Sequence, residues 1–196
     1  SAMPIFANFT FNGGVDTIGD VDLPNDNSVF VQRHPWISPG FFSALGMPVV
    51  AGREFTAADV AAGGEVAVVN EAFLRRFNLG PDVIGSRMQM TQGYGADSVE
   101  IVGIVGDAKY ASVKADTVAQ VYTPRPPRGG AFPAVFFYVR GALDEATLMR
   151  PVPAAVADVV PTLPVNGLET LEHRVGANVA QDRLIATLSA VFAALA

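Results

Sequence analysis

The sequence predicts an α+β protein in which a lobe of mixed helices and strands carries an inserted lobe made mainly of strands. The 196-residue chain is 50% hydrophobic and 16% charged, a composition that excludes intrinsic disorder and provides for a buried core. Short helix and strand patterns alternate over about residues 28–80 and return over about residues 134–170. Between them, about residues 85–125 carry mostly strand and turn signals. The most economical assembly joins the two outer stretches into one lobe and inserts the middle stretch as the other.

The N-terminal part of the first lobe is expected to contain three short strands, with helices between them. Residues 5–27 are rich in Gly, Asn and Asp and predict extended or loop structure. Alternating or β-branched runs then predict strands at Ser28–Arg33, Pro48–Ala51 and Glu65–Val69.

Each helix predicted in this lobe begins at a residue that can accept hydrogen bonds from the free N–H groups of the first turn. Ser38 is expected to cap a helix with a short apolar face. Thr56 and Asp59 resemble a capping box for a second helix, which ends at a Gly pair. Asn70 is expected to cap the amphipathic helix Glu71–Phe77.

The rest of the chain predicts more strands and one broken helix. The predicted strands or extended runs are Arg87–Thr91, Ser98–Val105, Gln120–Tyr122, Ala134–Arg140 and Val165–Leu168. A helix over Asp144–Val160 is expected to be interrupted by Pro151 and Pro153, because proline disrupts a helix interior. Thr170 is expected to begin the final helix.

Composition and motifs argue against catalysis, a cofactor or a metal ion. With 13 Lys and Arg against 19 Asp and Glu, the net charge is −6, so nucleic acid is not an expected partner. The absence of cysteine removes disulfides, thiolate nucleophiles and Cys-based metal sites. The two histidines, His34 and His173, do not have a zinc-ligand spacing. No phosphate-binding loop or G-x-S-x-G motif is found. We therefore assign no catalytic, cofactor-binding or metal-binding residue.

Two further sequence features weakly resemble ligand-binding motifs. The acidic stretch between residues 16 and 26 lacks the order of a calcium-binding loop, so a solvated loop is favoured. Gly103 and Gly106 resemble part of a dinucleotide-binding loop but lack the third glycine and the following helix. A bulge or a close approach of two backbones is therefore the favoured interpretation of Gly103 and Gly106.

A Pro- and Gly-rich loop provides the candidate partner contact. Arg125 and Arg128, together with Phe132, combine cationic and aromatic groups that are enriched in protein interfaces. We expect these three residues to contact a partner, although two arginines on such a loop are also typical of a solvated surface.

The two ends of the chain carry separate signals. Residues 1–3 (Ser-Ala-Met) are interpreted as a cloning remnant. Leu184–Ala196 contains no charge, Pro or Gly and has an apolar stripe at helical spacing. Taken alone, this stretch is equally consistent with a packed terminal helix and with the start of a membrane span, because thirteen helical residues rise only about 20 Å.

Several blocks of the sequence, taken in order, resemble the MacB-like periplasmic core domain of FtsX/MacB-type ABC transporter permeases, in particular the long permeases with two such halves. The blocks are PWISPGFFSALGMPVVAGREFTAAD (35–59), VAVVNEAFLRRF (66–77), VIGSR (83–87), EIVGIVGD (100–107), QVYTP (120–124) and AQDRL (180–184). No single block is diagnostic, but the ordered set is specific.

The resemblance implies a domain organisation. It implies a discontinuous porter-like α+β lobe over residues 4–84 and 126–183, truncated at its N-terminal part, and an inserted β-rich lobe over residues 85–125. It also favours a truncated membrane helix for residues 184–196. The chain would then be the periplasmic or extracytoplasmic domain of a bacterial inner-membrane protein.

The resemblance also implies a function and partners. Such a domain transmits ATP-driven movement of membrane helices to a periplasmic partner or cargo, without catalysis and without a cofactor. The implied partners are its own transmembrane helices, an ABC ATPase subunit, a second permease half or dimer mate, and a periplasmic adaptor, lipoprotein or hydrolase. The alternative is an extracytoplasmic ligand-binding or sensor module, which requires a concave pocket with convergent polar groups.

Overall fold

The computed structural model describes residues 11–23, 30–34, 36–91, 97–108, 117–124, 136–170 and 172–173. Within these residues the protein has an α+β fold, as the sequence predicts. The strands are β1 (Phe11–Ile18), β2 (Val21–Asp22), β3 (Phe30–His34), β4 (Val49–Gly52), β5 (Val66–Asn70), β6 (Arg87–Thr91), β7 (Asp97–Val105) and β8 (Gln120–Tyr122). The helices are α1 (Phe41–Leu45), α2 (Ala57–Ala61), α3 (Glu71–Phe77), α4 (Glu145–Met149) and α5 (Val152–Val159), with a 3₁₀ helix, η3 (Pro81–Val83).

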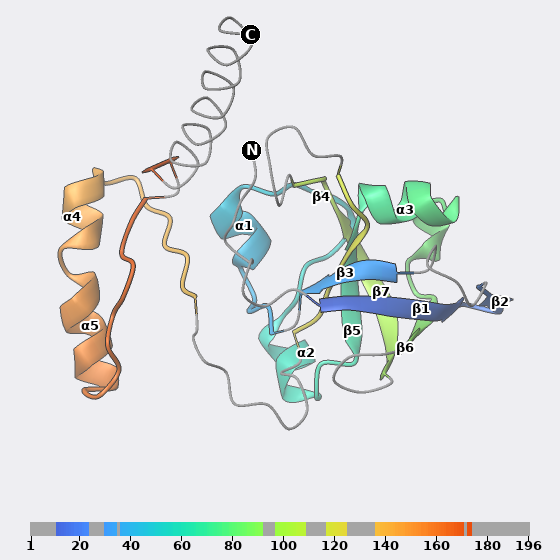
Figure 1. Ribbon diagram of the computed structural model, residues 1–196, viewed down its shortest axis with the longest axis horizontal. Helices are drawn as coiled ribbons and strands as arrows, with labels where there is room; N and C mark the ends of the chain where they lie inside the picture. Colours follow the sequence, from blue (N-terminus) through green and yellow to red (C-terminus); the bar gives the residue numbers. More distant parts are fainter. Residues whose placement is uncertain are drawn as a thin grey trace, which may run out of the picture.

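Six of these strands close on one another as a barrel (Figure 1). Around the ring, β1 pairs with β3, β3 with β8, β8 with β5, β5 with β7, β7 with β6, and β6 again with β1. The β3–β8 and β5–β7 pairs are parallel, and the other four pairs are antiparallel. β2 and β4 extend the sheet at the two ends of its strand order. Closure removes most of the free strand edges that an open sheet exposes.

The barrel interior is filled by one apolar cluster. Every barrel strand contributes fully or almost fully buried side chains to this cluster, and so does α3. Its members include Val15, Val31, Val69, Phe73, Met88, Met90, Ile101 and Val121. The side chains of a strand alternate between two faces, so the inward set takes every second residue except where the register of β1 and β7 shifts.

A second apolar cluster lies on the outside of the barrel, beneath α1. Phe41 and Phe42 of α1 contact Tyr122 of β8, and their ring centroids lie 6.4 and 5.1 Å from the Tyr122 ring. Phe55 packs beside Phe42 at 5.9 Å. Val68, on the outer face of β5, belongs to the same cluster. The barrel is therefore packed from within by one core and braced from outside by another.

The expected lobe boundary at residue 85 lies inside this barrel. Strands β1, β3 and β5 precede residue 85, whereas β6, β7 and β8 follow it, and all six surround the same core. In the described part of the chain, the sheet shows no break between these two sets of strands.

Most local predictions are confirmed to within one or two residues, and a few need correction. β1 and β2 form within a segment expected to be extended or loop structure, so the extended alternative is confirmed there. The N-cap of α1 is Gly40, with a φ of 83°, so the prediction that the Ser38 hydroxyl caps this helix is wrong. Glycine reaches this left-handed conformation without a steric penalty. The strand expected over Ala134–Arg140 is absent from its described part, residues 136–140.

Residues 136–170, which we call the C-terminal arm, lie beside the barrel in Figure 1. As predicted, the helix is interrupted at Pro151, which lies between α4 and α5. The predicted interruption at Pro153 is wrong, because Pro153 lies in the first turn of α5, where a helix tolerates proline. None of these 35 residues is buried. Two contacts tie the arm to α1: the Tyr138 ring lies 5.8 Å from the Phe41 ring, and Arg140 Nη1 donates to the Ser43 carbonyl at 3.2 Å.

No helix in the described part of the chain has the length and apolar character needed to cross a bilayer. The expected membrane helix over residues 184–196 lies outside the described residues.

Candidate functional site

Asn70 organises a buried polar network at the point where β5 passes into α3. Its carboxamide is fully buried and makes four hydrogen bonds. Oδ1 accepts from the Phe73 N–H at 3.0 Å, which is the predicted helix cap, and from the Gln120 N–H at 2.8 Å. Nδ2 donates to Asp107 Oδ1 at 2.9 Å and to the Val118 carbonyl at 3.0 Å. One side chain therefore links β5, α3, β8 and the chain that follows β7.

Asp107 extends this network to the surface of α3. Its Oδ1 also accepts from the Ala72 N–H at 2.8 Å, and its Oδ2 pairs with the Arg75 guanidinium. That hydrogen bond raises the pKa of Arg75. Negative charge beside the first turn of a helix is favourable, because the free N–H groups there carry partial positive charge. Both oxygens of Asp107 are thus engaged in holding α3.

The network continues outward from Gln120 along the barrel. Gln120 Oε1 accepts from the Tyr122 hydroxyl at 2.7 Å, and Gln120 Nε2 donates to Gln32 Oε1 at 3.2 Å. His34 stacks on the Tyr122 ring at 4.7 Å. Burial lowers the pKa of His34 to about 3, so this imidazole is neutral at physiological pH. A neutral buried imidazole stacked in a core has a packing role and does not exchange protons near pH 7.

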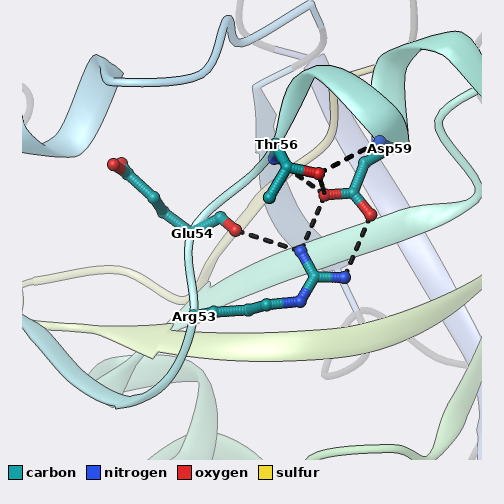
Figure 2. A network of polar contacts seen from close by, with 4 residues as sticks. All are labelled: Arg53, Glu54, Thr56 and Asp59. Carbon is teal, nitrogen blue, oxygen red and sulfur yellow. Dashed lines mark hydrogen bonds and ion pairs between the residues drawn. The ribbon is translucent and has the colours of Figure 1, made fainter.

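Arg53 and Asp59 form a second polar cluster at the start of α2 (Figure 2). The guanidinium binds the carboxylate through two contacts, Nη1 to Oδ2 at 2.7 Å and Nη2 to Oδ1 at 3.0 Å. The N–H and hydroxyl groups of Thr56 also donate to Asp59 Oδ2, each at 2.7 Å, which confirms the predicted capping box. The Arg53 hydrogen bond is the main reason that the pKa of Asp59 lies far below its usual range. These neighbours keep the Asp59 carboxylate ionised, so its role is to hold the start of α2 in place and not to act as an acid or a base.

Gly103 has a steric role in this region. A β-carbon at Gly103 would collide with the Arg53 carbonyl oxygen, and one at Gly106 would lie 2.9 Å from Pro48 Cγ. The β5–β7 register also shifts here, since Ala67 pairs with Ile101 and Val68 with Gly103. The close backbone approach and bulge favoured from the sequence are therefore confirmed at Gly103, where β7 pairs with β4.

Most of the large apolar side chains that are exposed in the described part of the chain belong to the C-terminal arm. Phe137 is 74% exposed and Val159 is 80% exposed. The other large apolar side chains exposed along the arm are Phe136, Val139, Leu143, Val160, Leu163, Val165 and Leu168. Exposed apolar side chains in such number are typical of interaction surfaces, so the arm is a candidate contact surface.

The three residues predicted to contact a partner, Arg125, Arg128 and Phe132, lie outside the described residues. Their role stays a prediction. Among the described residues, no group of three or more His, Asp or Glu side chains is placed to hold a metal ion.

Comparison with known proteins gives one match that covers most of the chain. The family model of the MacB-like periplasmic core domain matches residues 2–159. No curated protein sequence matches the chain.

Three solved structures are similar at low identity. The extracellular domain of the noncanonic ABC-type transporter YknZ from Gram-positive bacteria is 16% identical, with a TM-score of 0.36; the match covers 60% of this chain and 54% of that one. The periplasmic region of MacB from Actinobacillus actinomycetemcomitans is 16% identical, with a TM-score of 0.48, covering 76% of this chain and 65% of that one. A domain of a putative permease protein from Porphyromonas gingivalis is 13% identical, with a TM-score of 0.45 and 88% of each chain covered.

The chain thus spans 54% and 65% of the YknZ and MacB structures, and the assignment to a family rests on the family model. That model matches well over half of the 196 residues. The family description implies an extracytoplasmic location for the domain. The chain belongs to the MacB-like periplasmic core domain family, the periplasmic domain of ABC transporter permeases.

Proposed function

We propose that this domain transmits ATP-driven movement of the permease's membrane helices to a partner or cargo outside the membrane, and that it does so without catalysis. The partner would be a periplasmic adaptor, a lipoprotein or a hydrolase, and a second permease half or dimer mate would carry the matching domain. The single observation that carries the proposal is the closed six-stranded barrel with its continuous core.

A domain that transmits movement must rotate or shift as one body. Packed cores are bistable or rigid and are not continuously deformable, so a small displacement at one end is passed to the other. Here the barrel closes on itself, and the Asn70 network fixes α3 against β5, β8 and the chain after β7. These features support movement as a unit.

The polar clusters support a role without bond making. Asp107 and Asp59 each have both carboxylate oxygens bound by donors of the fold, and His34 is neutral and stacked. A general acid or base needs a pKa near the working pH and access to substrate. The pKa values of Asp59 and His34 lie far below physiological pH, and both oxygens of Asp107 are occupied by donors of the fold.

The test is a distance measurement in the full permease with its ATPase, reconstituted in lipid nanodiscs. Since the 196 residues contain no cysteine, spin labels in this domain go only to introduced sites. A pair of labels at Ala61 and Asp82, both exposed, measures a distance within one domain. A single label at Ala61 on each of two domains measures the distance between the domains.

On ATP binding, the distance within the domain is expected to stay constant while the distance between the two domains changes. A changed distance within the domain, or an unchanged distance between domains, would contradict movement as one body. Ligand screening by thermal shift on the same domain is the control for a sensor role, because a dose-dependent rise in melting temperature would favour a binding module.

A further inference from the structure

One carboxylate oxygen near α1 is buried without satisfying its hydrogen-bonding capacity. Glu54 Oε1 accepts from the Ser43 hydroxyl at 3.3 Å, whereas Glu54 Oε2 is buried and has no hydrogen-bond partner among the described residues. In Figure 2 the Glu54 side chain points away from the Arg53–Asp59 pair. A buried carboxylate oxygen without a donor is costly, so the position favours the approach of a cation.

Arg140 of the C-terminal arm and Glu54 of the barrel body both form a hydrogen bond with Ser43. Arg140 Nη1 donates to the Ser43 carbonyl, while the Ser43 hydroxyl donates to Glu54. The guanidinium also lies close to Gly46, where a β-carbon would be 3.0 Å from Nη1. Ser43 therefore separates an arginine of the arm from a carboxylate of the body that has a vacant acceptor.

Exposed apolar residues of the arm and of the barrel body lie within a few residues, along the chain, of those that make this contact. Val49 and Val50 of β4 follow Gly46 by three and four residues and are 42% and 52% exposed. β4 ends the strand order of the described sheet. On the arm, Phe137 and Val139 flank Tyr138, whose ring already contacts Phe41 of α1.

We propose that the C-terminal arm closes on the barrel as a latch, with Arg140 moving from the Ser43 carbonyl to an ion pair with Glu54 and the apolar side chains around Tyr138 covering Val49 and Val50. The occupant of the β4 surface is thus the chain's own arm. Opposite charge and the existing arm–α1 contacts favour this occupant, and a tethered segment binds at a high effective concentration. The latch does not depend on the proposed transmission role, because it is a property of the 196-residue chain alone.

The experiment measures the arm-to-body distance by electron spin resonance in this chain without ATPase or membrane. Spin labels are placed at Ala157 on α5 and Ala61 on α2, both exposed. The unsubstituted chain is expected to show a short, closed distance population beside a longer, open one. Glu54→Gln and Arg140→Gln should each lower the ratio of closed to open by about fivefold, the order expected for a partly exposed ion pair, and the double variant should lower it no further.

Two matched controls make the result specific. Arg150→Gln removes another arginine of the same arm and should leave the ratio unchanged. Val50→Asp should depopulate the closed state, whereas Val21→Asp, at an exposed valine on β2 at the other end of the strand order, should not. The latch is refuted if the unsubstituted chain shows no closed population, if Glu54→Gln leaves the ratio unchanged, or if Arg150→Gln lowers it as much as Arg140→Gln.

Discussion

Replacing Asn70 with alanine removes four hydrogen bonds from the interior of the domain. Two of them satisfy backbone N–H groups, at Phe73 and Gln120, and two are donated to Asp107 and to the Val118 carbonyl. Since Asn70 is fully buried, water cannot take its place without opening the fold.

The cost follows from these partners. Loss of a helix N-cap costs about 1 kcal/mol. Leaving the buried Gln120 N–H unsatisfied costs about 1–3 kcal/mol, and the two lost donor contacts cost about 1 kcal/mol together, because Asp107 keeps its other donors. The expected loss in the free energy of unfolding is therefore about 3–5 kcal/mol.

Urea unfolding of the 196-residue chain, followed by circular dichroism, provides the measurement. Asn70→Ser keeps the cap and should cost clearly less than Asn70→Ala. Asn70→Asp keeps both acceptor contacts but places a second carboxylate beside Asp107. One carboxyl pKa is then raised in the folded state, and the variant, compared with the parent at equal pH, should be less destabilised at pH 4 than at pH 7. A loss below about 1 kcal/mol for Asn70→Ala would refute the assignment of Asn70 as the organising residue.

Three further predictions concern the core and the braces. The pKa of His34 is about 3 in the folded chain and about 6.5 in the unfolded chain, so only the unfolded chain binds a proton there between these values. The free energy of unfolding therefore falls as pH drops below about 6.5, by up to about 1.4 kcal/mol per pH unit. His34→Gln should flatten the slope of the unfolding free energy against pH between about 6.5 and 5. Gly103→Ala should lower the free energy of unfolding by about 2 kcal/mol or more, and with it the melting temperature, because the added methyl group meets the Arg53 carbonyl. A loss below about 0.5 kcal/mol in urea unfolding would contradict that contact. Asp59→Ala should cost about 1 kcal/mol, because it removes the carboxylate that accepts from the Thr56 N–H in the α2 capping box and that pairs with Arg53. Arg53→Gln leaves both halves of the capping box in place and should cost less in the same assay.

The parts of the fold that depend on local chemistry could be predicted from the sequence. The cap at Asn70, the capping box at Thr56 and Asp59, and the helix break at Pro151 each depend on residues within a few positions of one another. The predicted cap of α1 is the exception. At α1 the left-handed conformation of Gly40 ends the preceding turn, and the Ser38 hydroxyl does not provide the cap.

The barrel could not be predicted in this way, because its closure depends on pairs distant in sequence. β1 pairs with β6 through Val15 and Met90, which are far apart along the chain, and β1 includes the run Asn12-Gly13-Gly14, whose residue types are depleted in strands. Tertiary pairing overrides that local preference. The same limit applies to the site, where Asn70 is recognisable as a cap but its contacts with Asp107 and Gln120 span 37 and 50 residues.

Closure of the barrel leaves few places at which the predicted strand at 134–140 could pair. A strand needs a neighbour with free backbone groups, and each barrel strand already has a partner on both sides. Within the described sheet, the ends of the strand order at β2 and β4 remain as places for an added element. Phe137, Tyr138 and Val139 are residue types enriched in strands, and Tyr138 and Arg140 hold this segment against α1, the helix that precedes β4 in the chain. The exposed apolar arm and the end strand are for this reason two halves of one contact.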